Sequence, residues 1–310
     1  MNVYFSGSGQ GEHEVDPRLL RAEEVHHRLL SCHDSYIRVA ETVMDTLIAA
    51  GVSHKFELLF DSGAFTAWSK GSEVNMDHLL SVYSRMAEKK HLFKAMWFIN
   101  LDKIPAEKGR TASPDEIVEA MDISRKNCDI LTAALGNCVI PVYHQNEPQD
   151  YLLELAANYD YICGSPRNDV AEKSRVAWSK EVHALIDTKT HGLATTGNRQ
   201  LGGVPWFSVD SATWIAIGSY GGIFHRKKSG LMVLPISSQS GELKNAGKHF
   251  NTFSPIEQDF LNNYFESQGF TLEGLAENHV ERMLFNRIEM LNFARDCAPK
   301  KALSRGLFDL

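Results

Sequence analysis

The sequence predicts an α/β fold of the TIM type: a (β/α)8 barrel with extra C-terminal helices. First, short apolar segments typical of strands alternate with helical segments over the first 240 residues. Second, polar residues follow the strands at their C-terminal ends, which converge on one rim in a barrel. An open doubly wound sheet is the alternative, but it would bring together only the strand ends near its switch point. We therefore expect a barrel domain over 1–240 and a helical extension packed on it over 241–310.

The distribution of apolar residues predicts eight strands and the helices between them. The strands are expected at 2–7, 55–63, 94–102, 138–145, 160–165, 191–197, 205–211 and 221–236, where a break of the last one into a hairpin is left open. The helices are expected at 17–50, 76–90, 114–135, 148–159, 170–187, 211–221 and from 254 onward. The apolar run from Phe56 to Phe60 is too continuous for an exposed edge strand, so it predicts burial on both faces.

Residues typical of helix ends support several of these boundaries. The segment SPDE (113–116) combines an N-cap residue with proline at the first helical position, and SPIE (254–257) repeats the pattern. Pro148 also stands near the start of its helix. Gly51 and Gly136 follow the last residues of two helices and are expected to end them.

Composition and charge exclude several classes of protein. The 310 residues are 43% hydrophobic and 23% charged, as in an ordinary globular protein, and no stretch approaches the roughly 18 apolar residues of a membrane span. The first residues show no secretory signal. Five scattered cysteines fit a reducing cytoplasm better than a disulfide framework. The formal net charge of -7 argues against a protein that coats nucleic acid through bulk charge.

Asp61 is the first candidate for chemistry, because it follows a buried strand directly. Ser62 and Gly63 come next, and their small size lets a ligand approach the carboxylate. The alternative is an N-cap role, but no helix is expected directly after Asp61. We therefore expect a functional carboxylate at this position.

Two further acids stand at strand ends. Asp210, in PWFSVDSATW (205–214), is either the N-cap of the helix that follows or a nucleophile or base. Asp102 ends the third expected strand. Lys103 could neutralise Asp102 in a simple surface ion pair, and that alternative is left open.

His144 and Gln145 close the fourth expected strand. An imidazole and an amide there can recognise the donor and acceptor edge of a ligand, although a hydrogen-bonded core histidine is equally compatible with the pattern. Gly164, at the end of the next strand, could let a planar ligand approach the backbone, or it could simply occupy a turn. The sequence contains no Cys-x-Cys, Cys-x-x-Cys or His-Glu-x-x-His pattern, so no zinc or other cofactor is expected.

Four basic residues follow the start of the eighth expected strand. They are His225, Arg226, Lys227 and Lys228. A loop after a late strand would lie on the same rim as Asp61, so these residues are the best candidates to contact the phosphates of a nucleic-acid backbone. A solvated surface is the alternative.

Taken in strand order, these residues make the chain resemble the tRNA-guanine transglycosylase superfamily. It is most similar to the bacteriophage-encoded DNA 7-deazaguanine transglycosylases, often described as queuine tRNA-ribosyltransferase-like. The resemblance covers about half of the chain and lies in LLFDSGAFTAW (58–68), FINLDKIP (98–105), PVYHQNEPQDYLLELAANYDYICGS (141–165) and KTHGLATTGNRQLGGVPWFSVDSATW (189–214). DSGAF is moderately specific, and its combination with YDYI-x-G and PW-F-SVDS-x-W is much more so.

The resemblance implies roles for the matching residues. Asp61, in the DSG motif, would bind the base and act as acid and base, and Asp210 would be the nucleophile. Asp102 would recognise the edge of the base. The remaining residues of the expected base-binding set are Ser62, Gly63, His144, Gln145 and Gly164. The Cys-x-Cys-x-x-Cys pattern and later His that hold zinc in the tRNA enzymes are missing here, which puts a tRNA-type C-terminal insertion in doubt.

The implied reaction replaces guanine in a polynucleotide, DNA rather than tRNA, by a 7-deazaguanine such as preQ0 through a covalent aspartyl-glycosyl intermediate. The expected partners are therefore DNA or tRNA and the 7-deazaguanine base, with no membrane; a homodimer is left open. The expected location is the cytoplasm, that of a bacterial host if the chain is phage-encoded. Two alternatives remain: a nucleosidase or glycosidase with Asp61 and Asp210 as its carboxylate pair, and a non-catalytic nucleic-acid-binding subunit.

Overall fold

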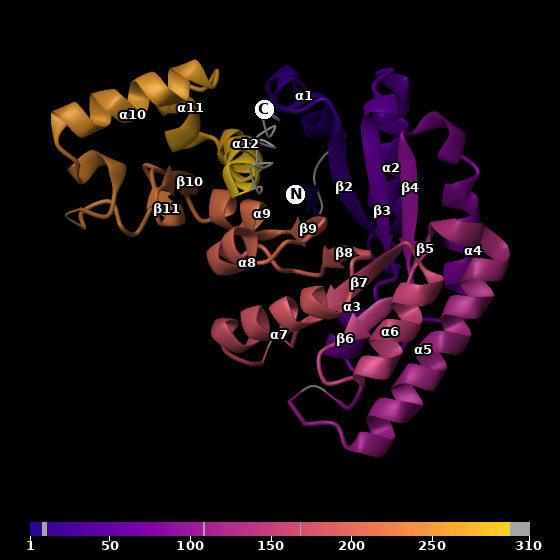
Figure 1. The fold of residues 1–310 in the computed structure, drawn as a ribbon. Helices are drawn as coiled ribbons and strands as arrows, with labels where there is room; N and C mark the ends of the chain where they lie inside the picture. Colours follow the sequence, from indigo (N-terminus) through magenta and orange to yellow (C-terminus); the bar gives the residue numbers. More distant parts are fainter. Residues whose placement is uncertain (8–10, 108, 168, 246, 298–310) are drawn as a thin grey trace, which may run out of the picture.

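The main sheet is a nearly closed parallel barrel, which confirms the predicted fold class (Figure 1). The computed structural model describes residues 1–7, 11–107, 109–167, 169–245 and 247–297. Within them the strand order is β5-β4-β3-β2-β1-β9-β8-β7-β6. The barrel strands are β1 (Asn2–Phe5), β2 (His26–Ser31), β3 (Phe56–Asp61), β4 (Ala95–Ile99), β5 (Val139–Ile140), β6 (Val142–His144), β7 (Tyr161–Ser165), β8 (Lys189–Gly192) and β9 (Ser208–Ser211).

A proline divides one strand position of this ring into two segments. Pro141 lies between β5 and β6, which stand at opposite ends of the strand order, so the two segments together complete the circle. Pro141 has no N–H to give to a neighbouring strand. Its carbonyl still accepts the backbone N–H of Cys163 at 2.8 Å. The nine segments therefore occupy the eight strand positions of a (β/α)8 barrel.

Helices surround the barrel on its outer face. They are α1 (Pro17–Ala22), α2 (Ile37–Ala49), α3 (Ala64–Ser69), α4 (Met76–Ala87), α5 (Pro114–Leu135), α6 (Gln149–Asn158), α7 (Glu172–Leu185), α8 (Asn198–Gly203) and α9 (Thr213–Ser219), with short 3-10 turns η1 (Gly11–Val15), η2 (Ser53–Lys55), η3 (Lys90–Leu92) and η4 (Gly136–Cys138). Ser113 forms the expected capping box with Glu116 at the start of α5.

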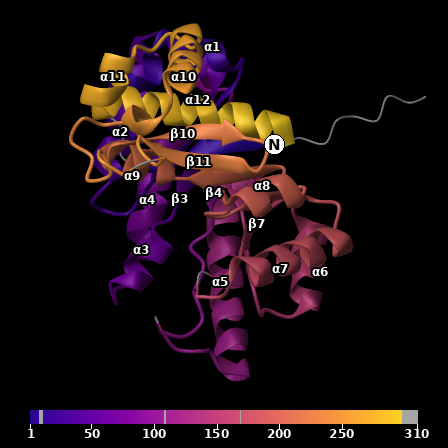
Figure 2. The same ribbon diagram turned by 90° about the vertical axis from the view of Figure 1, so that its left-hand side faces the viewer.

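The elements after the barrel gather on one side of it. They are the antiparallel hairpin β10 (Gly222–Lys227) and β11 (Gly230–Pro235), the turn η5 (Phe250–Thr252), and α10 (Pro255–Ser267), α11 (Leu272–Glu277) and α12 (His279–Cys297). Figure 2 shows α12 running along the hairpin. The capping box expected at Ser254 is present. A domain division at residue 240 stays a prediction, and residues 298–310 of the expected extension lie outside the described part of the chain.

Two strand assignments from the sequence are wrong. The expected helix 17–50 is divided into α1, β2 and α2. The strand was missed because His26, His27 and Arg28 are polar, although all three are buried. The segment 221–236 forms the hairpin that the sequence left open, β10–β11, but it is a separate two-stranded sheet and not the eighth strand of the barrel. The predicted number of eight barrel strands was correct only because two errors cancelled. The strand β2 was missed, and the hairpin was counted as a barrel strand.

Strand alternation decides which side chains face the inside of the barrel. In β3, Leu59 belongs to the interior cluster, whereas Leu58 and Phe60 pack against the outer helices. The apolar interior consists of Tyr4, Leu29, Leu59, Ile99, Ile140, Val142, Tyr161 and Cys163. Asp61 follows Leu59 by two residues, so the same period points it inward at the end of the strand.

Candidate functional site

A cavity of about 630 Å³ opens at the C-terminal ends of the barrel strands. Asp61, Asp102, His144 and Asp210 all line it. Each comes from a different strand position, so the barrel brings together side chains that are far apart in the sequence. A concave site of this size with a few converging polar groups is typical of a small-molecule or cofactor site.

Asp61 lies at the end of β3 among polar groups, and no cation of the described residues contributes to its pKa shift. Its Oδ2 accepts the backbone N–H of Gly63 at 3.2 Å and the hydroxyl of Ser31 at 3.4 Å. Burial, followed by the nearby charges of Asp102 and Asp210, raises the pKa of Asp61 from 3.8 to about 7. This carboxyl group can therefore both give and take a proton near neutral pH.

The expectation that no helix directly follows Asp61 is wrong, because α3 begins at Ala64. Asp61 is nevertheless not its N-cap. Gly63 holds that position with φ of +82°, and a Cβ there would lie 2.8 Å from the Cβ of His33. Ser62 is fully buried and its hydroxyl accepts the N–H of Ala64 at 3.4 Å. Ser62 and Gly63 thus shape the turn below Asp61, and neither is among the residues that line the cavity.

Asp210 is held at the end of β9 by neutral donors. Its Oδ1 accepts the backbone N–H of Ala194 at 2.7 Å, and its Oδ2 accepts the hydroxyl of Ser6 at 3.3 Å. The N-cap position of α9 is Ala212 rather than Asp210, and the Oγ of Ser211 accepts the N–H of Thr213 at 3.2 Å. The carboxylate of Asp210 is therefore available at the cavity wall rather than used to start α9.

Asp102 pairs with His144 across the cavity wall. The Asp102 Oδ2 lies 2.8 Å from His144 Nε2. Burial by itself lowers the pKa of His144, but the hydrogen bond and charge of Asp102 raise it above its ordinary value. Lys103, the partner considered from the sequence, instead pairs with Glu73 at 2.7 Å. Asp102 and His144 thus present one hydrogen-bonded pair to a ligand.

Gln145 lines a neighbouring cavity of about 430 Å³ instead of the carboxylate cavity. Its Oε1 accepts the backbone N–H of Arg167 at 3.0 Å. Five residues form the wall that the two cavities share: Phe65, Ile104, His144, Ser165 and Pro166.

Gly164 has a packing role in the structure. A Cβ on Gly164 would lie 2.8 Å from the ring of Trp206. Its carbonyl accepts the backbone N–H of Leu193 at 3.0 Å, and the residue is not among those that line the cavity. The absence of a side chain at this position therefore lets the indole of Trp206 pack on the barrel wall.

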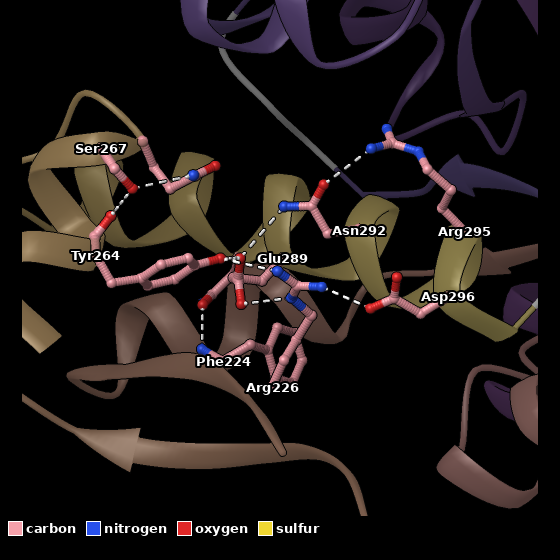
Figure 3. Close-up of polar contacts among 10 residues, drawn as sticks. Phe224, Arg226, Tyr264, Ser267, Glu289, Asn292, Arg295 and Asp296 are labelled. Atoms are coloured by element: carbon pink, nitrogen blue, oxygen red, sulfur yellow. Dashed lines mark hydrogen bonds and ion pairs between the residues drawn. The ribbon is translucent and has the colours of Figure 1, made fainter. Parts of the chain in front are cut away.

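The four basic residues lie on β10 and the turn after it, away from the cavity lining. Figure 3 shows that the guanidinium of Arg226 is engaged by α10 and α12. It donates to Glu289 at 3.2 Å, to Asp296 at 2.6 Å and to the hydroxyl of Tyr264 at 3.1 Å. Lys227 and Lys228 are exposed, and His225 is half-buried. Arg226 thus fastens the hairpin to the C-terminal helices.

Several residues of the site carried no signal in the sequence analysis. Ser31 was missed with its strand, and the interactions of Ser6 and the Ala194 N–H with Asp210 depend on neighbouring strands. Of the described residues that line the cavity, none is a lysine or an arginine. The described chain also contains no group of three or more His, Cys, Asp or Glu side chains arranged to hold a metal, and none of its helices is both long and apolar enough to cross a membrane.

Comparison with known proteins gives only a distant structural likeness. No protein-family model and no curated protein matches the chain. A solved chain described as "Structural study of Project ID from Aquifex aeolicus VF5" is similar over 69% of this chain and 84% of its own length, with 12% identity and a TM-score of 0.37. A likeness this weak carries no argument about function.

Proposed function

We propose that the protein is a transglycosylase that exchanges guanine in a polynucleotide, DNA in preference to tRNA, for a 7-deazaguanine such as preQ0. One observation carries the proposal: Asp210 and Asp61 line one cavity, and the pKa of Asp61 lies at about 7. The motif resemblance supplies the identity of the base and the preference for DNA.

The first half of the reaction begins with Asp210 as a carboxylate and Asp61 as a neutral acid. An oxygen of Asp210 bonds to C1′ of the nucleoside while the C1′–N9 bond breaks, and the electron pair of that bond leaves with guanine. The proton of Asp61 neutralises the leaving purine. A glycosyl ester on Asp210 and an ionised Asp61 remain.

The second half reverses these roles with a different base. Asp61 removes the proton from N9 of the incoming 7-deazaguanine, and that nitrogen displaces Asp210 from C1′. Asp61 is then neutral and Asp210 is a carboxylate again, so no co-reactant is consumed. Two successive inversions retain the configuration at C1′, as in glycosidases with a nucleophilic carboxylate.

The remaining lining residues fit recognition of a neutral planar ligand. The Asp102–His144 pair offers both an acceptor and a donor to the edge of a purine. Phe65 is 52% exposed beside the cavity and can stack on a base. Since no lysine or arginine is among the described lining residues, we infer that the cavity takes the base and sugar, and that the phosphates stay outside. The target base would first be turned out of a duplex.

The test is mass spectrometry of nucleosides from guanine-labelled DNA and tRNA that have been incubated with the protein and preQ0. We expect loss of the labelled guanine and incorporation of preQ0 into DNA. Asp210→Asn removes the nucleophile, so we expect at least about a thousandfold slower exchange. The control is Asp160→Asn, at an exposed position.

Three outcomes would contradict the proposal. Full exchange by Asp210→Asn would exclude the covalent route. Release of guanine with an abasic product and no incorporation would favour a nucleosidase on the same barrel. DNA binding with a steep salt dependence, but without an adduct or exchange, would favour a nucleic-acid-binding subunit.

A further inference from the structure

A line of hydrogen-bonded side chains reaches Asp210 from inside the barrel. Tyr161 of β7 contacts the hydroxyl of Ser208, and Ser208 Oγ lies 2.7 Å from His191 Nδ1. The other ring nitrogen, His191 Nε2, lies 3.5 Å from Asp210 Oδ1. His191 and Ser208 are fully buried. These two side chains are therefore shielded from bulk solvent, and their polar atoms bond to one another and to Tyr161.

The contacts agree with one direction of donation. If Nδ1 of His191 carried the proton, the lone pair of Nε2 would point toward the negative charge of Asp210. The opposite arrangement avoids this repulsion: Tyr161 donates to Ser208, Ser208 donates to His191 Nδ1, and Nε2–H faces Asp210. Nε2 has no other hydrogen-bond partner among the described residues. Asp210 Oδ1 is thus the acceptor that this buried N–H can reach by a small movement.

Neutral donors then surround one oxygen of Asp210. Oδ1 already accepts the backbone N–H of Ala194 at 2.7 Å, and Nε2–H of His191 would be its second donor. Among the described residues, the donor to Oδ2 is the hydroxyl of Ser6 alone, at 3.3 Å. This asymmetry leaves Oδ2 as the oxygen with free lone pairs.

We propose that His191, held as the Nε2–H tautomer by Ser208 and Tyr161, is a positioning residue that fixes Oδ1 of Asp210 and so presents Oδ2 to C1′ of the nucleoside. This inference rests on the proposed transglycosylation. The bond to C1′ forms at Oδ2, and Oδ1 becomes the carbonyl oxygen of the glycosyl ester. The electron pair of the broken C1′–N9 bond leaves with the base, so His191 itself neither gains nor loses a proton.

The effect of His191 differs between the two states of Asp210. An N–H donor stabilises a carboxylate more than an ester carbonyl, because the bond to the charged group is about twice as strong. His191 therefore favours the free carboxylate and helps Asp210 to leave C1′ in the second half of the reaction. Without His191 the ester becomes the relatively more stable state.

Two variants of His191 test this prediction. In His191→Leu we expect the fraction of enzyme trapped as the covalent adduct, at fixed guanine and DNA concentrations, to rise about tenfold. Because the second half of the reaction is slowed, kcat and the KM for DNA should both fall by a similar factor, so that kcat/KM changes little. His191→Gln places an amide N–H near the position of Nε2, so we expect it to restore much of both values. A loss of structure alone would lower the adduct fraction instead of raising it.

A measurement on the unmodified protein separates this inference from the proposed function. Nitrogen-15 NMR of the histidine side chains, with His191 assigned from its missing signal in His191→Gln, reports which ring nitrogen carries the proton. We expect Nε2–H at neutral pH, and Ser208→Ala is expected to weaken that preference. An Nδ1–H tautomer, or an unchanged adduct fraction in folded His191→Leu, would overturn the role of His191. A protein with the Nε2–H tautomer that forms no adduct with any nucleic acid would instead contradict the transglycosylation.

Discussion

Two acids inside the protein, Glu14 and Asp61, have pKa values shifted in opposite directions. Glu14 is fully buried and bonds to Arg28 and Arg287, each at 2.8 Å. Burial alone would raise its pKa, but the charges of Arg287 and Arg28 hold it at about 2. At the cavity wall, burial and two neighbouring aspartates raise the pKa of Asp61 to about 7, and no cation in the described part of the chain opposes them.

The difference shows that the partner, rather than burial, decides what an interior carboxyl group does. Glu14 stays charged at every physiological pH and ties β2 to α12 through its two arginines. Asp61 changes its charge near neutral pH, which suits acid and base chemistry. One region of the molecule uses charge to join distant segments, and the other keeps charge uncompensated at a reactive site.

The largest expected change in stability comes from removing the charge of Glu14. Glu14→Gln leaves Arg28 and Arg287 buried without a counter-charge, so we expect a loss of about 3–5 kcal/mol in the free energy of unfolding. Urea unfolding at pH 7 measures it. The matched control is Glu73→Gln, whose side chain is 81% exposed. A loss below about 1 kcal/mol would show that the two arginines do not depend on Glu14.

Asp61→Asn should raise the free energy of unfolding near neutral pH, whereas Glu14→Gln lowers it. Since folding raises the pKa of Asp61 from 3.8 to about 7, the neutral form stabilises the folded state, and this contribution is lost as the pH rises toward 7. Asparagine never ionises. The difference in free energy of unfolding between the variant and the wild type should therefore grow in favour of the variant by about 1.4 kcal/mol per pH unit between pH 5 and 7. The total over this range is at most about 2.7 kcal/mol.

Urea unfolding of Asp61→Asn and wild type at pH 5, 6, 7 and 8 checks this dependence. Asp160→Asn, at an exposed position, should give a difference that does not change with pH. A flat difference for Asp61→Asn as well would mean that Asp61 titrates at its ordinary value. The pKa values of Asp61 and Glu14 would then not be shifted in opposite directions.

Arg226 provides an intermediate case, because its side chain is 29% exposed and that of its partner Glu289 only 1% (Figure 3). Arg226→Met leaves Glu289 with the hydroxyl of Tyr264 and the side-chain amide of Asn292, but without Arg226 as its counter-charge. We expect a loss of about 1–3 kcal/mol in the free energy of unfolding. Lys228→Met changes an exposed cation on the same hairpin and should be nearly neutral. Equal effects of the two variants would contradict a specific role for Arg226.

The smallest effect is expected for the exposed pair of Lys103 and Glu73. Their side chains are 46% and 81% exposed, so Lys103→Met should cost less than about 1 kcal/mol. Unfolding in low and high salt measures it, and high salt should reduce the difference further. A larger cost would indicate that Lys103 also compensates Asp102, as the sequence left open.

Much of the fold could be predicted because its signals are local. The N-caps Ser113 and Ser254 form with residues three positions away, and α5 and α10 begin where these patterns place them. The strand β2 could not be predicted in the same way. His26, His27 and Arg28 look solvent-exposed in sequence, and the burial of Arg28 depends on its ion pair with Glu14 and on backbone carbonyls from distant segments.

The site was predictable in part for the same reason. Asp61, Asp102, His144 and Asp210 stand at strand ends, and a barrel must bring strand ends to one rim. Gly164 lies within β7, next to the inward-facing Cys163, so strand alternation places it on the outer side against Trp206. Gln145 follows β6 and lines the neighbouring cavity instead. Beyond the last residue that is paired with a neighbouring strand, the alternation of inward and outward side chains no longer applies. The direction of such a side chain depends on the segments packed around it.

The sequence by itself determined most of the alternation of strands and helices, the starts of α5 and α10, and the residue types at the strand ends, since each depends on contacts within a few residues. Only the tertiary structure decided which carboxyl group meets a cation and which meets other acids. It placed two arginines on Glu14, two aspartates near Asp61 and His191 behind Asp210. The charge of a group inside a protein depends on atoms that lie close in space, and closure of the barrel brings those atoms together from distant parts of the chain.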